Sequence, residues 1–571
     1  MADVSIFEIL PEEIRLHVFQ YLSCADIVYS FSNLNTRFNA TLTHVCNPMN
    51  FNNITYQQFD CLMSNILPKI GSNIRSFVVN EHWANFISNK LHPIRFKFDL
   101  SSIFPNLHTL VLDCFTDADL LEFIDDIRDL KQLLKLVVKR LDGQRSYELL
   151  EKVFTANNRR LKSVLFDYDS LYLSVNTNNE NVSYPNIEEL TLNLIYCDMI
   201  GNLFQLVPNI RRLHITFGES PGVSLTSLMN APPLIHLKEF ELHSIGMFWE
   251  LSDIADILSK MPSLHKLTLD LSTDDQRLVN GQNLPIILPS SLIEIQFCIL
   301  YYFSESQIKI DSLVGTWPNH IPISCWLHEF QKYAIIHTTP YNVFSMVVPA
   351  TIGRYMLSGW KYMQPVEYLK IYGESSSIDV LMVVQHLHRL RKLNINIRND
   401  SEEPIMMQLT EPVILHLPRL KYLQVEGKCE LFHLLNAASS LHELSVDFDS
   451  FSRIMDNEAV HQLLQQRIVR LEIFRLRDIH KLRLDTIFKL FPHIRNLVLS
   501  VKDSSVFIDS LVWQTLNIWK EQQQHAYLCI KGPLSDEGNQ TLRKWLIEHI
   551  YTPITDSFAF DYQNKWIHFW F

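Results

Sequence analysis

The segment Pro208-Asn-Ile-Arg-Arg-Leu-His-Ile215 decides the fold, because close copies of it recur along the chain. In each copy, hydrophobic residues occupy the third, sixth and eighth positions. The other clear copies begin at Pro105, Pro185, Pro262, Pro418 and Pro492, and weaker ones begin near residues 131, 159, 235, 290, 364, 388, 439 and 466. Successive starts lie 21 to 30 residues apart within the runs 105–290 and 364–492. A period of this length indicates a stack of similar supersecondary units.

The second half of each copy has the alternation of a β-strand. In the copy that begins at Pro105, Leu110 and Leu112 would point to one side of the strand, and Thr109 and Val111 to the other. The proline falls just before the strand, where its missing N–H removes no bond of the ladder. Each copy therefore predicts one strand with a hydrophobic inner side.

Helical patterns lie between the copies. Leu120, Ile124 and Ile127 recur at helical spacing, and so do Leu251, Ile254 and Leu258. A unit of one strand and one helix cannot bury its hydrophobic side without a stacked neighbour. The pattern resembles leucine-rich repeats, which implies an α/β solenoid with parallel strands on its concave face and helices outside. The alternative, leucine-rich strands of an ordinary α/β domain, would not produce so regular a spacing.

The repeat divides the chain into four predicted regions. Residues 1–50 are helical, and residues 51–104 are interpreted as a helical linker with a degenerate first repeat. The solenoid is expected over 105–500, with an irregular insertion or unrecognised repeat at about 298–363. Residues 501–571 are predicted to be a C-terminal cap that contains a helix over 534–550 and a hairpin over 556–571.

The N-terminal 50 residues predict three short helices. The first helix starts at Leu10-Pro11 and carries Ile14, Val18 and Leu22 along one side, with Phe19 at its edge. Ser23 and Asp26 then form a start similar to a capping box for a second helix. A third helix is expected through Arg37, Phe38 and Leu42.

These landmarks, in this order, resemble an F-box, and their combination with the repeats resembles the F-box/leucine-rich-repeat family. The resemblance implies that the module binds a Skp-type adaptor, and through it cullin and RING subunits. It places Leu10, Pro11, Ile14, Val18, Phe19 and Leu22 in or beside the adaptor interface. The alternative is a helical cap that buries the end of the first repeat.

Composition excludes several other classes of protein. The 571 residues carry 50 − 62 = −12 formal charges without a basic run, which disfavours nucleic-acid binding. Nine scattered cysteines without a CxxC pair argue against disulfides and against a zinc module, and they predict a cytoplasmic or nuclear location. The N-terminal residues do not resemble a signal peptide. Pro285 and Pro289 interrupt the most hydrophobic stretch, so we expect no membrane span.

No catalytic motif is visible, and we expect neither an enzyme nor a bound cofactor or metal. The histidines are dispersed, and the adjacent acidic pairs lie at predicted helix starts, strand edges and turns. On this interpretation the chain positions a substrate for catalysis by partner subunits. A hydrolase or transferase hidden within 298–363 is the alternative from another class.

The outward positions of the strands are the expected substrate-binding surface. Tyrosine and arginine are favoured there as interface anchors. The candidate residues are Arg212, His214, Tyr368, Lys370, Tyr372 and Tyr422. The three tyrosines are predicted to form one patch, and the alternative is that they are ordinary exposed strand residues. The expected function is that of the substrate-recognition subunit of an SCF-type ubiquitin ligase, and the alternative is an interaction scaffold with a degenerate F-box.

Overall fold

The computed structural model of the chain divides it into two compact units. The first comprises Met1–Ile54 and Gln58–Thr338, and the second comprises Thr55–Gln57 and Thr339–Phe571. The structure describes residues 10–32, 42, 48–51, 54–80, 83–84, 87, 99–143, 148–175, 182–218, 225–303, 312–313, 315–328, 332–341, 345–349, 366–373, 377–385, 387–397, 415–427, 429, 431–477, 482, 484–501, 506–521, 527–550, 559–563 and 566–570.

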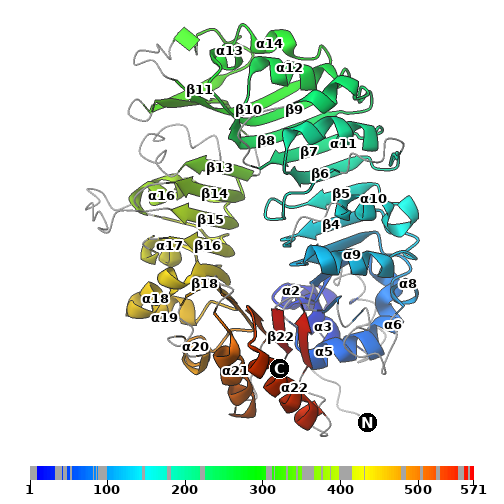
Figure 1. Cartoon of the computed structure of the whole chain (residues 1–571), viewed down its shortest axis with the longest axis vertical. Helices are drawn as coiled ribbons and strands as arrows, with labels where there is room; N and C mark the ends of the chain where they lie inside the picture. The colour runs from blue at the N-terminus through cyan, green and yellow to red at the C-terminus, as the bar shows by residue number, and fades with distance from the viewer. Residues whose placement is uncertain are drawn as a thin grey trace. The chain divides into compact units, whose positions relative to one another are not determined.

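The strands of the first unit form one open sheet (Figure 1), in the order β1 to β10 followed by β12 and then β11. The strands are β1 (Met49–Asn50), β2 (Ser76–Asn80), β3 (Thr109–Asp113), β4 (Lys135–Lys139), β5 (Ser163–Phe166), β6 (Glu189–Leu194), β7 (Arg212–Phe217), β8 (Glu239–Phe248), β9 (Lys266–Thr273), β10 (Glu294–Tyr302), β11 (Ile323–His328) and β12 (Tyr333–Thr338). All neighbours from β1 to β10 are parallel.

The repeated phrase explains this register. Leu213 of β7 lies opposite Leu190 of β6 and Phe240 of β8, and all three side chains are fully buried. The same inward position therefore stacks on itself from one repeat to the next. Burying a side chain of this size contributes roughly 1.5–3 kcal/mol, so the stacked positions supply most of the sheet's cohesion.

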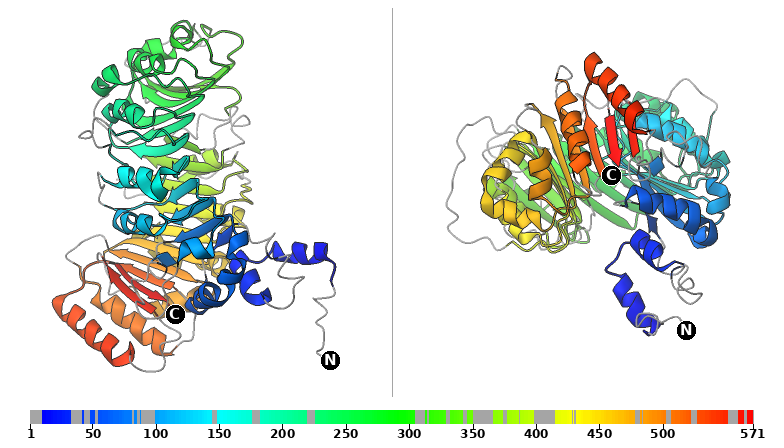
Figure 2. Two further views of the ribbon diagram at one scale, coloured as in Figure 1. Left: turned by 90° about the vertical axis from the view of Figure 1, so that its right-hand side faces the viewer. Right: turned by 90° about the horizontal axis from the view of Figure 1, so that it is seen from below.

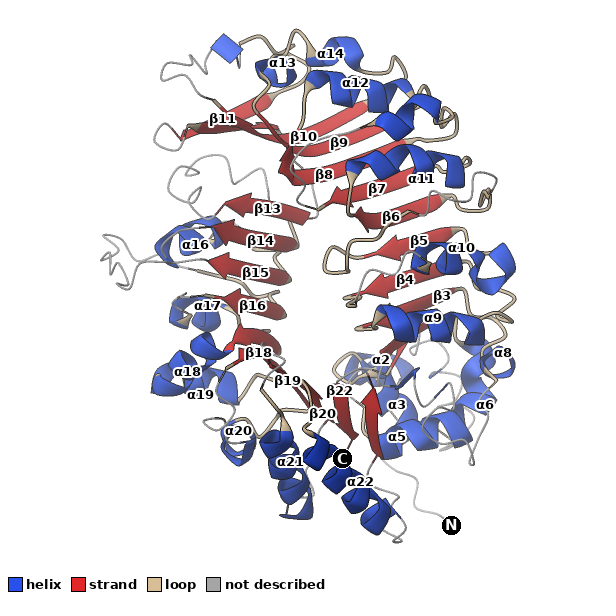
Figure 3. Ribbon diagram, viewed as in Figure 1, coloured by secondary structure: helices blue, strands red, loops and turns tan. Residues whose placement is uncertain are grey.

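Helices lie along one face of this sheet (Figure 3). The helices of the repeats are α8 (Leu100–Ile103), α9 (Asp117–Asp126), α10 (Leu149–Arg159), η3 (Cys197–Met199), α11 (Ile200–Leu206), η4 (Thr226–Asn230), α12 (Leu251–Ser259), α13 (Gln276–Val279) and α14 (Leu284–Ile287). The helices before them are α2 (Glu12–Phe19), α3 (Cys24–Phe31), α5 (Tyr56–Cys61), the π-helix η1 (Leu62–Ile66), α6 (Leu67–Ile70) and η2 (Gly71–Asn73). None of the described helices covers the opposite side of each sheet, which we call its helix-free face.

Local sequence sets the start of these helices. The side chain of Thr116 accepts a hydrogen bond from the Asp119 amide, which caps α9. Leu120 and Ile124 are then buried against the sheet. A polar cap followed by spaced hydrophobic residues is the pattern that predicted this helix.

The parallel order ends at an antiparallel hairpin. Residues 298–301, which the sequence pattern assigns to an irregular insertion, belong to β10 and pair in regular parallel register with β9. β12 then pairs antiparallel with both β10 and β11. The parallel order of the strands therefore stops at β10. The connection from β11 to β12 is only four residues long, too short for the crossover that a parallel pair requires.

The second unit has its own open sheet, in the order β13 to β20 followed by β22 and β21. Its strands are β13 (Ser345–Pro349), β14 (Tyr368–Gly373), β15 (Lys392–Ile397), β16 (Tyr422–Glu426), β17 (Glu443–Asp447), β18 (Arg470–Leu476), β19 (Asn496–Val501), β20 (Tyr527–Lys531), β21 (Ala559–Gln563) and β22 (Trp566–Trp570). Its helices are α16 (Ser377–Val384), α17 (Phe432–Ala437), α18 (Phe448–Asp456), α19 (Glu458–Gln465), α20 (Leu484–Leu490), α21 (Asp509–Glu521) and α22 (Asp536–Ile550).

This sheet is parallel from β13 to β20, and the hairpin of β21 and β22 adds two antiparallel strands at one end. Leu393, Leu423 and Leu444 occupy one inward position on consecutive strands and are almost fully buried. The repeat pattern therefore builds the second sheet in the same way as the first. Among the described residues, no helix is long and hydrophobic enough to cross a membrane.

Candidate protein-interaction surfaces

The N-terminal helices α2 and α3 project beyond the repeats of the first unit (Figure 2). Pro11 precedes the first residue of α2, as its sequence pattern predicts. Ser23 caps α3, because its hydroxyl oxygen accepts a hydrogen bond from the Asp26 amide at 3.0 Å and its hydroxyl donates to the Asp26 carboxylate at 2.7 Å. The third predicted helix lies largely outside the described residues, where only Leu42 is described, and it is buried.

One side of this helix pair exposes large hydrophobic residues. Ile14, Val18, Tyr21 and Leu22 are 48%, 36%, 78% and 42% exposed, and we call them the N-terminal apolar face. Phe19 is 1% exposed, and its ring lies 5.2 Å from that of Phe31. Of the residues predicted to lie in or beside an adaptor interface, Ile14, Val18 and Leu22 share this open surface. Pro11 is exposed, Leu10 is partly buried, and Phe19 lies inside the helix pair.

The helix-free face of the first unit carries a row of alternating charges. The row consists of Lys135, Glu189, Arg212, Glu239, Lys266 and Glu294, all at the starts of their strands. Arg212 pairs with Glu189 at 3.0 Å, and its side chain is 54% exposed. Lys266 lies between Glu239 and Glu294, at 3.8 Å and 3.6 Å. The predicted interface residue Arg212 is therefore present on this face, with its charge already paired.

His214, next to this row, contacts a buried polar cluster. Its Nδ1 lies 3.3 Å from Glu241, and Glu241 lies 2.5 Å from Nε2 of His243. The other ring nitrogen of His243 lies 3.3 Å from Asp270. The hydroxyl of Tyr168, which follows β5, approaches Nε2 of His243 at 3.4 Å. His243 therefore lies between the carboxylates of Glu241 and Asp270, and it also contacts Tyr168, which lies in a loop three strands away.

This geometry fixes the charges in the cluster. Burial opposes the charge of His243, but the charge of Glu241 and the hydrogen bonds with Asp270 and Glu241 raise its pKa to about 10. Burial also opposes the charge of Glu241, yet the charge of His243 and their hydrogen bond lower its pKa to about 2. Burial raises the pKa of Asp270 despite the hydrogen bond and charge of His243. His243 is therefore an imidazolium at neutral pH.

A cysteine and a histidine near this cluster also have shifted pKa values, which set their protonation states. Cys298 of β10 lies beside Asp270 on one side and His337 of β12 on the other. Burial, with a further contribution from Asp270, raises the pKa of the Cys298 thiol well above its usual value. Burial lowers the pKa of His337 to about 4, although its Nδ1 bonds the Thr338 carbonyl at 2.8 Å. A protonated thiol beside a neutral, buried imidazole is a poor nucleophile pair.

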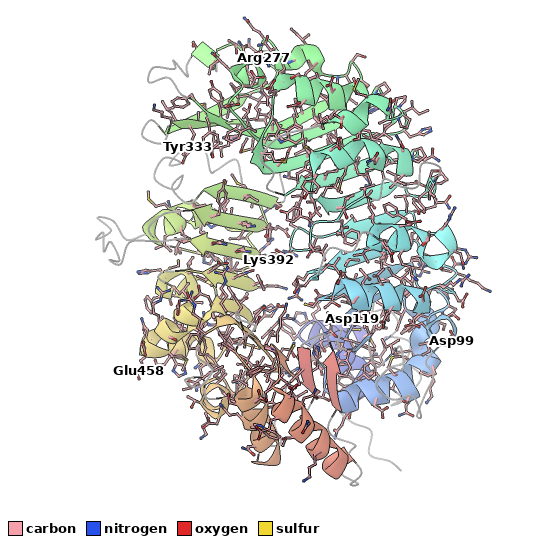
Figure 4. All side chains as sticks on the ribbon, viewed as in Figure 1. Asp99, Asp119, Arg277, Tyr333, Lys392 and Glu458 are labelled. Atoms are coloured by element: carbon pink, nitrogen blue, oxygen red, sulfur yellow. The ribbon has the colours of Figure 1, made fainter. Side chains whose placement is uncertain are left out.

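The helix-free face of the second unit brings two predicted tyrosines together around a lysine. Tyr368, Lys392 and Tyr422 occupy one position on β14, β15 and β16. The ammonium of Lys392, labelled in Figure 4, lies 4.5 Å from the centre of the Tyr422 ring and 5.6 Å from that of Tyr368. These distances are those of cation–π contacts.

The other predicted residues of this face lie nearby on β14, where Lys370 and Tyr372 are half-buried. The prediction that Tyr368 faces solvent needs correction, because this residue is only 7% exposed. Its strand position is as the alternation predicted, but its ring is covered, in part by the contact with Lys392. Beyond this row, Asn394 donates a hydrogen bond to Gln424 at 3.1 Å.

Five residues of these two clusters were absent from the predicted set: Tyr168, Glu241, His243, Asp270 and Lys392. All except Tyr168 stand at outward strand positions that alignment of the repeats reveals; Asp270, for example, lies directly opposite His243. Aligning neighbouring repeats column by column would have placed His243 beside Asp270, with Glu241 two residues before His243 on the same strand. Among the described residues, no group of three His, Cys, Asp or Glu side chains is arranged to hold a metal ion.

Comparison with known proteins adds little to this description. No protein-family model and no curated protein matches the sequence. Among solved structures, the chain is similar to a leucine-rich-repeat protein from Leptospira interrogans, with 14% sequence identity and a TM-score of 0.26. That likeness covers 84% of this chain and 96% of the other. The repeat character of this chain is shown by its own repeated phrase and by the parallel strands that the phrase forms.

Proposed function

We propose that this chain is the substrate-recognition subunit of an SCF-type ubiquitin ligase. In this proposal residues 1–50 form an F-box that binds a Skp-type adaptor, and the leucine-rich repeats bind the target protein. The chain itself catalyses nothing. It holds the substrate while cullin and RING subunits bring the ubiquitin-charged enzyme.

The observation that carries this proposal is the N-terminal apolar face. Ile14, Val18 and Leu22 follow one another along one side of the first helix and its end, while Phe19 packs inside. A helix pair that only capped the repeats would bury its hydrophobic side against them. Exposed, contiguous hydrophobic side chains indicate a surface that another protein covers.

The repeats favour binding over catalysis. Their helix-free faces carry charged and aromatic side chains, which serve recognition well. Two buried histidines of the first unit have pKa values shifted away from neutrality, to about 10 for His243 and about 4 for His337. A general acid or base works best with a pKa near the working pH.

Co-expression of the full chain with a Skp-type adaptor tests the proposal. We expect the two proteins to co-elute in size exclusion, and Ile14→Asp or Leu22→Asp to abolish co-elution while leaving the circular dichroism spectrum unchanged. Ile293→Asp is the matched control. Ile293 is also an exposed hydrophobic residue, at 81%, but it lies just before β10 and is not part of the N-terminal apolar face. If no adaptor binds the unmodified chain, or if both variants still bind, the interaction scaffold replaces the ligase subunit.

A further inference from the structure

A row of aliphatic side chains crosses the helix-free face of the first unit. Val78, Val111, Val137 and Leu165 occupy one outward position on β2, β3, β4 and β5, and the parallel register sets them side by side. Each of the four is half-buried, whereas the inward residue Leu136 beside Val137 is fully buried. The helices α9 and α10 lie on the other face of these strands (Figure 3). We call the four outward residues the apolar stripe.

The apolar stripe ends on both sides where polar residues take the same position. Asn50 of β1 stands opposite Val78, and Thr191 of β6 stands opposite Leu165, followed by His214 of β7. Valine favours strands, so a single outward valine needs no further explanation. Four aliphatic residues in consecutive repeats form a contiguous hydrophobic surface with a polar border, and such a surface indicates contact with another protein.

Positive charge borders the stripe at the edge where the strands start. Glu189, which starts β6, lies 3.9 Å from Lys135, and Glu188 lies 2.8 Å from Lys162. Arg75 is exposed, and it forms no ion pair with another of the described residues. The border over β2 to β5 is therefore cationic, and acids enter it only at β6. The residues at and just before the starts of β2 to β5 are Arg75, Ser76, His108, Thr109, Leu134, Lys135, Lys162 and Ser163.

The opposite border of the stripe carries a lysine between two acids that are bound within the chain. Lys139 ends β4, is exposed and lies opposite Asp113 of β3. The Asp113 carboxylate accepts two hydrogen bonds from the Arg140 guanidinium, at 2.9 Å and 2.5 Å. Asp167, which follows β5, accepts hydrogen bonds from the Arg140 amide at 2.9 Å and from the Ser170 hydroxyl at 2.7 Å. The central strand β4 therefore presents a lysine on each side of the stripe.

The length of the stripe suits an α-helix laid across the strands. Strands about 4.8 Å apart place the first and last residues of the stripe about 14 Å apart. A helix rises about 1.5 Å per residue, so residues at i, i+3, i+7 and i+10 lie on one side and span about 15 Å. Residues two apart in an extended chain are about 6.6 Å apart, which does not match the strand spacing.

We propose that the apolar stripe binds an amphipathic helix of the partner protein whose hydrophobic side is flanked by acidic residues. The hydrophobic side chains of that helix pack on the stripe, and its carboxylates lie over Arg75, Lys135 and Lys139. The inference rests on the proposed function only in taking this partner to be the ligase substrate. It names the kind of segment that is recognised.

Fluorescence anisotropy with the full chain measures binding of a fluorescein-labelled, end-blocked helical peptide of about 15 residues, with leucines at i, i+3, i+7 and i+10 and glutamates beside them. Val111→Thr/Val137→Thr keeps the β-branched shape of both residues but replaces one methyl group of each with a hydroxyl. We therefore expect this double variant to bind the peptide at least about tenfold more weakly.

The matched control is Ile235→Thr/Ile293→Thr, which changes two residues outside the stripe that are 54% and 81% exposed. We expect it to bind the peptide as the unmodified chain does. Equal affinity in Val111→Thr/Val137→Thr, or an equal loss in the control, would overturn the inference.

Two further peptides test the helical and the acidic character of the ligand. One has the same composition with leucine at every second position, the pattern of an extended strand, and the other has lysines in place of the glutamates. Both should bind at least about tenfold more weakly than the first peptide. Equal or tighter binding of either peptide would overturn the inference.

Ile14→Asp separates this inference from the proposed function. That variant should lose the adaptor and keep the peptide. If the unmodified chain binds the peptide but no adaptor, only the ligase role is contradicted. If it binds an adaptor but not the peptide, only the present inference is contradicted.

Discussion

Nε2 of His243 lies 2.5 Å from the carboxylate of Glu241 on the helix-free face of the first sheet, and the His243 ring is buried. The pair is held by Asp270 from the next strand and by Tyr168 from above. A buried imidazolium between two carboxylates stabilises the fold only while all its partners remain. The cluster therefore links the stability of the first unit to single side chains and to pH.

His243→Gln should destabilise the first unit by about 3 kcal/mol at pH 6, because it leaves Glu241 and Asp270 buried without their cation. Urea unfolding followed by circular dichroism measures this loss as a lower midpoint. His442→Gln is the control in the second unit, where that histidine is more exposed and lies 3.0 Å from the Ser440 carbonyl and 3.8 Å from Glu443. A His243→Gln midpoint equal to that of the control would contradict a structural role for the cluster.

The same cluster has a defined pH window. The raised pKa of His243, about 10, contributes stability that is complete below about 6.5 and is lost as pH rises through 10. The lowered pKa of Glu241, about 2, contributes stability that is complete above about 4.5 and is lost as pH falls toward 2. The free energy of unfolding of His243→Gln should therefore fall furthest below that of the unmodified chain between pH 5 and 6.

His337 should make the first unit less stable as pH falls from about 6.5 toward 4. Its folded pKa of about 4 lies below the unfolded value of about 6.5, so the unfolded chain binds more protons in this range. The difference corresponds to at most about 3 kcal/mol at the acid end. Urea midpoints measured at pH 7, 6 and 5 should fall in the unmodified chain. They should fall less in His337→Gln, and parallel curves would refute this assignment.

Two glycines at matching places test how tightly the second sheet packs at its strand ends. Gly373 ends β14 with φ +104°, and Gly427 follows β16 with φ +97°. A Cβ at Gly427 would overlap the carbonyl oxygen of Ile397, whereas a Cβ at Gly373 meets no atom within 4 Å. Gly373→Ala should therefore cost only the backbone strain, about 1–2 kcal/mol.

Gly427→Ala adds the steric overlap to the same strain, so its cost should exceed that of Gly373→Ala by at least about 1 kcal/mol. Thermal unfolding of the two variants in parallel makes the comparison. Equal melting temperatures would show that the β15 backbone yields to the added methyl group, and that packing at this strand end is looser than the structure indicates.

The structural features that recur in every repeat could be predicted from the sequence, whereas those that occur at one place only could not. Leu190 and Leu213 were identifiable as inward residues because every copy of the phrase places leucine there. An irregular insertion was predicted over about 298–363, but the antiparallel pairing of Tyr333–Thr338 was not, because this segment carries no copy of the phrase. The contact between Tyr168 and His243 joins residues 75 apart in sequence. Such a contact depends on the path of one loop, and no local pattern reports that path.

The same distinction applies to the candidate surfaces. Alternation placed Tyr368, Tyr422 and Lys392 on the outward side of their strands, and the parallel register then set them side by side. Alternation could not reveal that Tyr368 is covered, because exposure depends on what neighbouring repeats place above a residue. In the N-terminal helices, helical spacing identified Ile14, Val18 and Leu22 as one stripe, but it left open which side faces outward.

In the N-terminal helix pair, Phe19, which stabilises the helices, directly follows Val18, which belongs to the proposed interface. Phe19→Ala removes a ring that is 1% exposed and should cost about 3–5 kcal/mol of local stability. Val18→Ser changes a residue that is 36% exposed and should cost within about 0.5 kcal/mol. Amide hydrogen exchange over residues 12–31 should therefore accelerate in Phe19→Ala alone.

Adaptor binding should weaken in both variants. Phe19→Ala unfolds the helices, whereas Val18→Ser removes a hydrophobic contact from folded helices. If Val18→Ser kept full adaptor affinity while Ile14→Asp lost it, the interface would lie toward the start of α2 and exclude its last turn.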